Sequence, residues 1–144
     1  MTFARPADRA VRGLKAGYSL LEILIVLAII ALIAALVGPR LFAQLDRSKT
    51  TSARVQAKSL ASGLDTMRLD IGRFPTQEEG LTLLESAHGA ANWNGPYLSG
   101  SLPKDPWGRD YIYAAPGEGQ EPKVSSLGAD GKPGGEGPNT DVSN

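Results

Sequence analysis

The sequence KAGYSLLEILIVLAIIALIAALVGPR, residues 15–40, contains one charged side chain between Lys15 and Arg40, that of Glu22. About 20 apolar residues are enough for a helix to cross the ~30 Å hydrocarbon core of a bilayer. The stretch therefore predicts a transmembrane helix, and the basic residues before it predict a cytoplasmic N-terminus. A carboxylate near the start of such a helix is costly, so its presence needs a reason.

The small residues beside this stretch indicate how the carboxylate is used. A secretory signal peptide has its small-residue cleavage site after the apolar core, whereas Ala16 and Gly17 stand before it. A cut after Gly17 would remove the basic tip, keep the apolar segment and leave a new α-amino group on Tyr18. Glu22, four residues on, would then pair with this amine in the same subunit or in a neighbouring one. The alternative is an acid that extends into the lipid headgroups.

Helical periodicity continues past the apolar run and predicts one helix from about residue 18 to about residue 71. Its second half is amphipathic, because apolar side chains recur at helical spacing at Leu60, Leu64, Met67 and Ile71. This half should pack on a soluble domain, while the first half is apolar all round. Gly38-Pro39 interrupts the first half, and proline removes a backbone hydrogen bond, so we expect a kink or local melting there.

The residues after this helix predict a small mixed domain. Residues 75–86 favour a short helix, with acids in its first turn. Residues 87–108 predict a loop, and residues 109–115 and 122–127 predict two antiparallel strands. The expected fold class is α+β, with a long N-terminal α-helix packed on a small C-terminal domain that has a short helix and a small antiparallel β-sheet.

Composition excludes several functional classes. The chain has no Cys, which excludes a thiol nucleophile, a zinc–thiolate site and a disulfide framework. Residues 1–17 hold four basic side chains and one acidic one, a net charge of +3, and the remainder holds 11 basic and 14 acidic ones, a net charge of −3. No basic segment interleaved with aromatic residues is present, so we expect no nucleic-acid binding.

Catalytic motifs are also absent from the sequence. His88 is the single His, and there is no Ser-His-Asp set, GxSxG elbow or metalloprotease helix. Asp105 and Asp110 are the carboxylate pair to consider, but isolated acids in loops are usually solvated. We therefore expect a protein that is not an enzyme. The side chains expected to pack the small domain against the long helix, rather than to line a ligand groove, are Pro106, Trp107, Tyr111 and Tyr113.

The Gly-rich segment 128–144 is the second candidate site. It fails as a Walker loop, because Lys132 is followed by Pro rather than Ser or Thr. It fails as an EF-hand, because Lys132 and Gly134 replace acidic ligands and no helices flank the segment. Asp130 and Asp141 nevertheless supply the hard carboxylate oxygens that calcium prefers, beside backbone carbonyls. The alternative is a flexible polar tail.

The N-terminal stretch AGYSLLEILIVLAIIALIAALVGPRL resembles the start of type IV pilins and of the pseudopilins of type II secretion systems. In that superfamily a prepilin peptidase cuts after the glycine and methylates the new N-terminal residue. The resemblance implies cleavage between Gly17 and Tyr18 and N-methylation of Tyr18, where Phe is the usual residue. It also implies that Glu22 is the assembly glutamate and that Pro39 is the helix-kinking proline.

Four later segments resemble the major pseudopilin of type II secretion: RFPTQEEGL, GPYL, LPKDPWGRDYIY and SLGADGKPGGEGPNTD. The resemblance implies a pilin fold and calcium bound in the C-terminal loop. It places the carbonyl of Leu127 and the carboxylate of Asp130 at ligand positions. Asp141 is our choice for the second acidic ligand, with Asn139 as a weaker one. Type IV pilins usually carry a C-terminal disulfide loop, which this chain lacks.

The resemblance implies a filament subunit with three parts. Residues 1–17 are a cleaved leader, residues 18–46 are the transmembrane and assembly half of the long helix, and residues 47–144 are a periplasmic domain. The expected location is the bacterial inner membrane, crossed once. The expected partners are other copies of the chain in a pseudopilus, minor pseudopilins, the prepilin peptidase and the inner-membrane secretion platform. The alternatives are a type IV pilin for adhesion or motility, and a membrane-anchored enzyme or binding protein.

Overall fold

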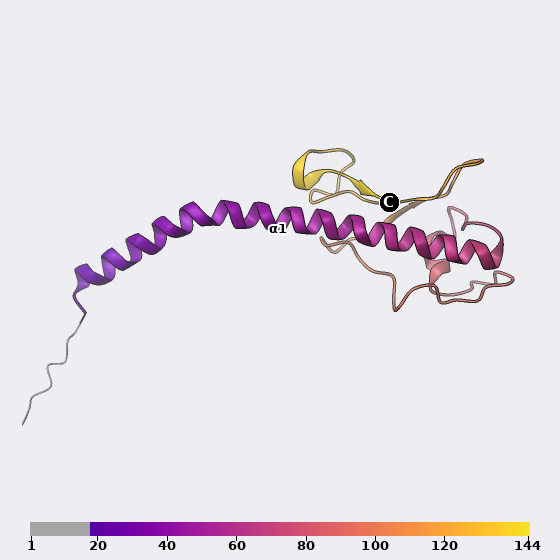
Figure 1. The fold of residues 1–144 in the computed structure, drawn as a ribbon, viewed down its shortest axis with the longest axis horizontal. Helices are drawn as coiled ribbons and strands as arrows, with labels where there is room; N and C mark the ends of the chain where they lie inside the picture. Colours follow the sequence, from indigo (N-terminus) through magenta and orange to yellow (C-terminus); the bar gives the residue numbers. More distant parts are fainter. Residues whose placement is uncertain (1–17) are drawn as a thin grey trace, which may run out of the picture. The chain divides into compact units, whose positions relative to one another are not determined.

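A single long helix, α1 (Leu20–Ile71), forms the N-terminal half of the structure (Figure 1). The computed structural model describes residues 18–144; the predicted leader and Gly17 lie outside them. The chain forms two compact units, of which one ends at Pro39 and the other spans Arg40–Asn144. The predicted functional boundary between residues 46 and 47 stays a prediction.

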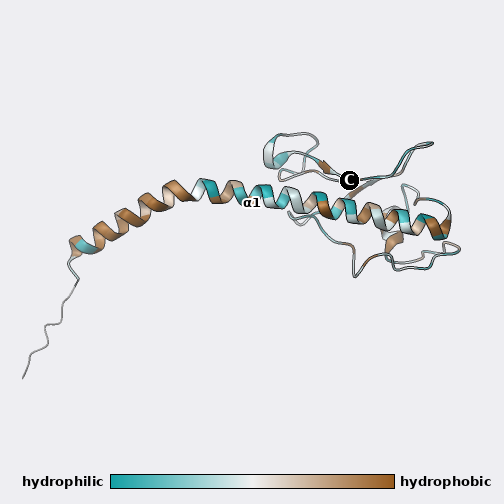
Figure 2. Ribbon diagram, in the orientation of Figure 1, coloured by the Kyte–Doolittle hydropathy of each residue, from teal (hydrophilic) through white to brown (hydrophobic). Residues whose placement is uncertain are grey.

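The first half of α1 is the apolar segment, drawn in brown in Figure 2. Within the described residues, α1 is the one helix long and apolar enough to cross a membrane. Pro39 lies inside α1, and the helix continues through Gly38 and Pro39 instead of melting there. The missing N–H of Pro39 therefore does not end the helix, because the turns on both sides retain their own hydrogen bonds.

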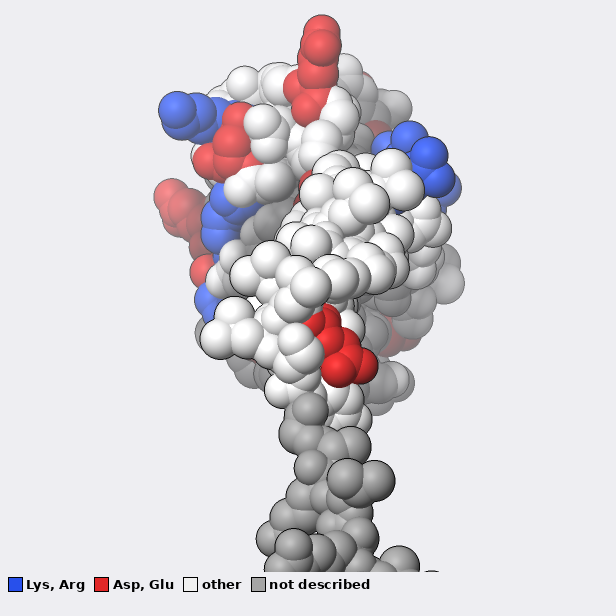
Figure 3. All heavy atoms as spheres, turned by 90° about the vertical axis from the view of Figure 1, so that its left-hand side faces the viewer, with Lys and Arg blue, Asp and Glu red and all other residues white. Residues whose placement is uncertain are grey.

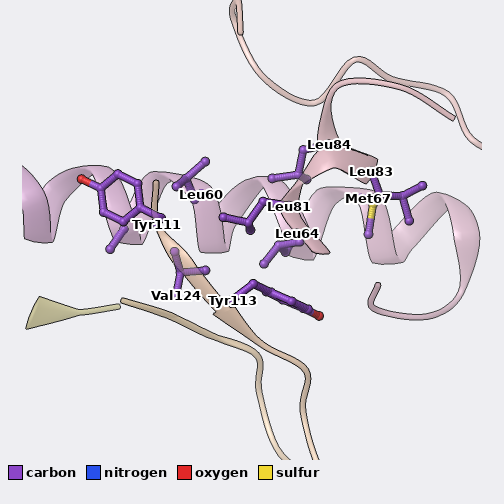
Figure 4. Close-up of a cluster of buried hydrophobic side chains, with 10 residues drawn as sticks. Leu60, Leu64, Met67, Leu81, Leu83, Leu84, Tyr111, Tyr113 and Val124 are labelled. Carbon is purple, nitrogen blue, oxygen red and sulfur yellow. The ribbon is translucent and has the colours of Figure 1, made fainter. Parts of the chain in front are cut away.

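The second half of α1 supplies one side of the core in the unit Arg40–Asn144. Its fully buried side chains are spaced three or four residues apart, as the sequence predicted. They meet a short helix and two strands that arrive from later in the chain (Figure 4). The cluster consists of Ala57, Leu60, Leu64, Met67, Leu81, Leu83, Leu84, Tyr111, Tyr113 and Val124. Removing one such leucine side chain from a core typically costs about 2–5 kcal/mol.

A three-stranded antiparallel sheet, in the order β1-β2-β3, closes the core. β1 (Ile112–Ala114) and β2 (Lys123–Ser126) fall inside the two predicted strand ranges. They pair with Tyr113 opposite Val124, so the buried side chains of both strands face α1. The fold class is therefore confirmed.

The third strand, β3 (Val142–Ser143), was not predicted from the sequence. It pairs with β2, with Val142 opposite Ser126. Asn144 extends the pairing, because its backbone N–H donates to the carbonyl of Val124 at 3.2 Å and its side-chain Oδ1 accepts from the N–H of Val124 at 2.8 Å. A strand of two residues has no periodicity to detect, and its one apolar anchor, Val142, is buried by tertiary contacts alone.

The predicted short helix over residues 75–86 is observed as a single 3₁₀ segment, η1 (Gly80–Leu84). A reciprocal cap precedes it: Glu79 Oε2 accepts from the N–H of Thr76 at 2.8 Å, and Thr76 Oγ1 accepts from the N–H of Glu79 at 3.2 Å. Arg73 adds two side-chain hydrogen bonds to Glu79, of 2.6 and 2.8 Å. Hydrogen bonding from Arg73 is the main cause that lowers the pKa of Glu79 to about 2.

Replacing Glu79 by Gln should lower the free energy of unfolding at pH 7 by about 1 kcal/mol, the usual value of a helix cap and an exposed ion pair. Because the pKa of Glu79 is lowered in the folded state, its stabilisation is present at neutral pH and is lost as the pH falls from about 4.5 to about 2. Urea unfolding of the full chain in detergent should therefore show a larger difference at pH 7 than at pH 3.

Glu78→Gln is the matched control for this experiment. Glu78 is exposed and, among residues 18–144, makes no side-chain hydrogen bond or ion pair. Its replacement should leave the unfolding free energy nearly unchanged at both pH values. Equal effects of the two variants would contradict the specific role of Glu79.

Candidate functional site

The N-terminal part of α1 presents an apolar surface that no described part of the chain covers. Tyr18 is 79% exposed, and the large apolar side chains from Leu20 to Val37 are 42–83% exposed. In Figure 3, which views the chain from this side, the segment is white apart from a red acidic group near its start. A continuous apolar surface of this length requires lipid or a partner protein.

Glu22 is the single charged residue on this surface, in the first turn of α1. The positive end of the helix dipole favours a carboxylate at this position. Within residues 18–144, however, the side chain of Glu22 has no hydrogen bond or ion pair. Its predicted partner, the amine of Tyr18, arises only by a cut at Gly17, outside the described residues.

The Gly-rich loop between β2 and β3 is folded tightly on itself. The N–H of Ala129 donates to the carbonyl of Pro138 at 2.9 Å, and η2 (Gly137–Asn139) forms a turn before β3. Gly128 and Gly135 both have positive φ, and a Cβ on either would lie 2.7 or 2.6 Å from the carbonyl oxygen of Asn139. Glycine is therefore required at these two positions by both conformation and space.

The predicted calcium ligands lie in this loop, but their carboxylates do not form a cage. Asp130 Oδ1 accepts from the N–H of Lys132 at 3.1 Å, and Asp141 Oδ2 accepts from the N–H of Gly134 at 2.9 Å. Asp130, Asp141 and Asn139 are exposed, and Leu127 is half-buried. Across residues 18–144 no cluster of three or more His, Cys, Asp or Glu side chains is suited to a metal ion.

The donor chemistry of the loop nevertheless fits calcium. Each of the two carboxylates keeps an oxygen that makes no side-chain hydrogen bond within the described part of the chain. The backbone carbonyls of Asn139 and Thr140 both approach the position of a Cβ on Gly128, at 2.7 and 2.8 Å. Calcium accepts a mixture of carboxylate and carbonyl oxygens and tolerates irregular geometry.

A buried carboxylate, Asp105, lies beneath the loop, which corrects the expectation that both acids of KDPWGRD are solvated. Asp105 is only 4% exposed, whereas Asp110 is exposed and pairs with Lys104 at 3.0 Å. Asp105 Oδ2 accepts from the hydroxyl of Ser126 at 2.6 Å, and Oδ1 accepts from the N–H of Arg109 at 2.8 Å. Burial opposes its ionisation, but these hydrogen bonds hold the pKa of Asp105 below its ordinary value.

Arg109 connects this carboxylate to the Gly-rich loop. Its guanidinium donates to the backbone carbonyls of Gly128 and Ala129, and its Nε lies 3.6 Å from Asp105 Oδ2. Sequence reasoning did not identify Arg109 as part of the site. The available signal was the Asp-Pro-x-Gly pattern, which is typical of a turn whose aspartate bonds its own following backbone.

The two tyrosines at and just before β1, Tyr113 and Tyr111, pack the domain against α1, as expected, rather than lining a ligand groove. Tyr111 and Tyr113 are each 6% exposed. The hydroxyl of Tyr111 donates to Gln56 Oε1 at 2.7 Å, and that of Tyr113 donates to the carbonyl of Pro75 at 2.8 Å. Burial raises the pKa of both hydroxyls to about 12. Pro106 and Trp107 are half-buried, and within the described residues neither belongs to the side chains packed on this core; the ring centroid of Trp107 lies 5.8 Å from the guanidinium carbon of Arg109.

Comparison with known protein families identifies two matching segments. A family model described as "Type II secretion system (T2SS), protein G" matches residues 40–144. A second, described as "Prokaryotic N-terminal methylation motif", matches residues 12–38. The second match supports N-methylation, and because it includes the apolar part of α1 it suits a membrane-anchored pseudopilin.

Individual relatives agree with the family models. The type II secretion system core protein G of Xanthomonas campestris pv. campestris is 38% identical over 131 residues, which cover 91% of this chain and 90% of the relative. That of Pseudomonas aeruginosa is 38% identical over 137 residues, which cover 92% and 96%. The crystal structure of the major pseudopilin from the type 2 secretion system of enterohaemorrhagic Escherichia coli matches with a TM-score of 0.59 at 34% identity, over 74% of this chain and 94% of that one.

These matches decide between the pseudopilin and the type IV pilin as the family of this chain. The N-terminal motif alone is shared by pilins and pseudopilins, whereas the model over residues 40–144 is specific to type II secretion, and its family is not an enzyme family. The chain therefore belongs to the protein G family of the type II secretion system, the family of the major pseudopilin.

Proposed function

We propose that the mature chain starts at Tyr18, after a prepilin peptidase has removed residues 1–17 and methylated the new N-terminus. The chain then crosses the inner membrane once, with its C-terminal domain in the periplasm. From there it polymerises into a pseudopilus, with minor pseudopilins and an inner-membrane secretion platform, and so drives protein export across the outer membrane. The observation that carries this proposal is the exposed apolar surface from Leu20 to Val37.

The bundle of apolar helices in such a filament would replace lipid as the cover of this surface. Extraction from the membrane then costs little, because the apolar side chains stay out of water in both states. Two charges remain to be matched in the apolar bundle, Glu22 and the amine of Tyr18. Pairing Glu22 of one subunit with the Tyr18 amine of its neighbour would neutralise both and fix the axial register of the helices.

Replacing Glu22 by Ala should abolish filaments while leaving membrane insertion and cleavage after Gly17 intact. The apolar helix keeps its length and hydropathy in this variant, and only the partner of the Tyr18 amine is lost. Electron microscopy of cells that overproduce the full chain would count filaments, and mass spectrometry of the N-terminus would report cleavage.

Glu22→Asp is the matched variant, because it keeps the charge on a side chain shorter by one methylene. It should retain part of the filament yield. Filaments of normal number and length from Glu22→Ala would overturn the pairing with Tyr18.

We further propose that the loop between β2 and β3 binds calcium through the carbonyl of Leu127 and the carboxylates of Asp130 and Asp141, with Asn139 as an additional oxygen donor. The support is the donor set described above and the glycines that let carbonyls approach. A bound calcium ion would supply the positive charge that holds two carboxylates together in one loop. Since the loop leads directly into β3, its closure would stabilise the edge of the sheet.

Calcium should raise the melting temperature of the full chain in detergent relative to excess chelator. A ligand at 100 times its dissociation constant stabilises the folded state by about 2.7 kcal/mol. Asp130→Ala and Asp141→Ala should lose most of this response. Glu136→Ala, an exposed acid in the same loop, is the matched control and should keep it. A melting temperature unaffected by calcium would overturn the metal site and leave the filament proposal in place.

A further inference from the structure

A line of basic side chains runs along α1 directly after the apolar segment. Arg40, Arg47 and Arg54 are seven residues apart, and Lys58 follows four residues later. Seven residues make about two helical turns and four make about one, so all four side chains lie on one side of the helix. All four are exposed. We refer to these four residues as the basic face.

The basic face has no counter-charge of its own. In the described part of the chain, the three ion pairs are Arg73–Glu79, Lys104–Asp110 and Arg109–Asp105, and none of them includes a residue of the basic face. Side-chain hydrogen bonds give the same result: across residues 18–144 none involves these four residues. Four cations in a row without intramolecular partners create a positive potential that attracts an acidic surface.

The remainder of the domain supplies acidic groups in excess. Residues 59–144 contain six basic and 12 acidic side chains, a net charge of −6. Two of the acids, Glu118 and Glu121, lie in the connection between β1 and β2, are exposed and make no ion pair in the described part of the chain. Arg68 and Arg73 line a surface hollow together with Glu121. Both arginines already have partners, because Arg68 lies over the ring of Phe74 and Arg73 pairs with Glu79.

Resting on the proposed polymerisation, we infer that the basic face binds a second copy of this chain through the acidic connection that carries Glu118 and Glu121. Two basic faces repel each other, so the contact joins different surfaces of the two copies. Such a heterologous contact repeats from subunit to subunit and generates an open filament unless it closes into a ring. The basic face thus gives the apolar bundle a direction.

An anionic lipid surface is the competing occupant, and the length of the basic face argues against it. Arg40 and Lys58 are 18 residues apart, which is about 27 Å along the helix axis. The potential of a charged membrane decays over about 8 Å at physiological ionic strength. A helix that leaves the membrane after residue 46 carries Arg54 and Lys58 about 12 and 18 Å farther along its axis, and therefore out of this reach.

Introduced cysteine pairs test the contact in the full processed chain, because the natural chain has no Cys. Arg54→Cys combined with Glu118→Cys should give a ladder of disulfide-linked multimers under mild oxidation. Lys49→Cys with Glu118→Cys is the matched control. Lys49 is also exposed, but it lies nine residues, about two and a half turns, after Arg40 and hence on the opposite side of the helix. This pair should give no ladder.

Charge exchange tests the same contact without a covalent bond. Arg47→Glu with Arg54→Glu should reduce filament yield at least about threefold, and adding Glu118→Lys and Glu121→Lys should restore it. Lys49→Glu should change nothing. Wild-type filaments with no ladder from the Arg54–Glu118 pair would overturn this inference but leave polymerisation standing. If Arg47→Glu with Arg54→Glu instead removes only salt-sensitive binding to phosphatidylglycerol vesicles, the occupant is lipid and the inference is wrong.

Discussion

The two halves of α1 require different surroundings, and the rest of the structure depends on this constraint. Residues before Pro39 leave their apolar side chains uncovered, whereas Ala53, Leu60 and Met67 on the same helix are fully buried by the domain. Folding of the domain can bury only the second set, since its core is complete without the first. The uncovered half therefore requires lipid or other apolar helices around it.

The parts of the fold that repeat locally were predictable from the sequence. Spacing of leucines predicted α1, and alternation predicted β1 and β2, because one side of each element faces the core. β3 was missed because one residue, Val142, anchors it. The burial of Asp105 was missed for a related reason: Ser126 is brought to it by the tertiary fold, and only its bond with the N–H of Arg109 lies within a local turn. Patterns within a segment cannot register partners that lie 21 residues away.

The candidate calcium site also has a part that the sequence predicted and a part that only the folded structure shows. Asp130 and Asp141 were chosen from the type of their side chains, and the structure holds both in one loop, each bonded to a nearby backbone N–H. The residue types did not indicate which contacts hold this loop in its conformation. Asp105 bonds Ser126 of β2, and Arg109 bonds the carbonyls at the start of the loop. Gly128 and Gly135 admit the carbonyl of Asn139. These contacts combine segments far apart in the chain, so only the folded structure displays them.

In the proposed filament, charged side chains would supply the directional contacts that the burial of apolar surface does not. Burial of apolar surface is strong but non-directional, so a bundle of smooth apolar helices would slide and rotate at little cost. Individual exposed ion pairs are weak, about 0–1 kcal/mol each, and would not assemble a filament alone. In the proposed filament the two kinds of contact would have separate roles: the apolar half of α1 would supply the affinity, and charged groups at fixed intervals would select one register. A lone carboxylate at Glu22, followed after the apolar run by cations along one side of the same helix, is the arrangement that this separation of roles requires.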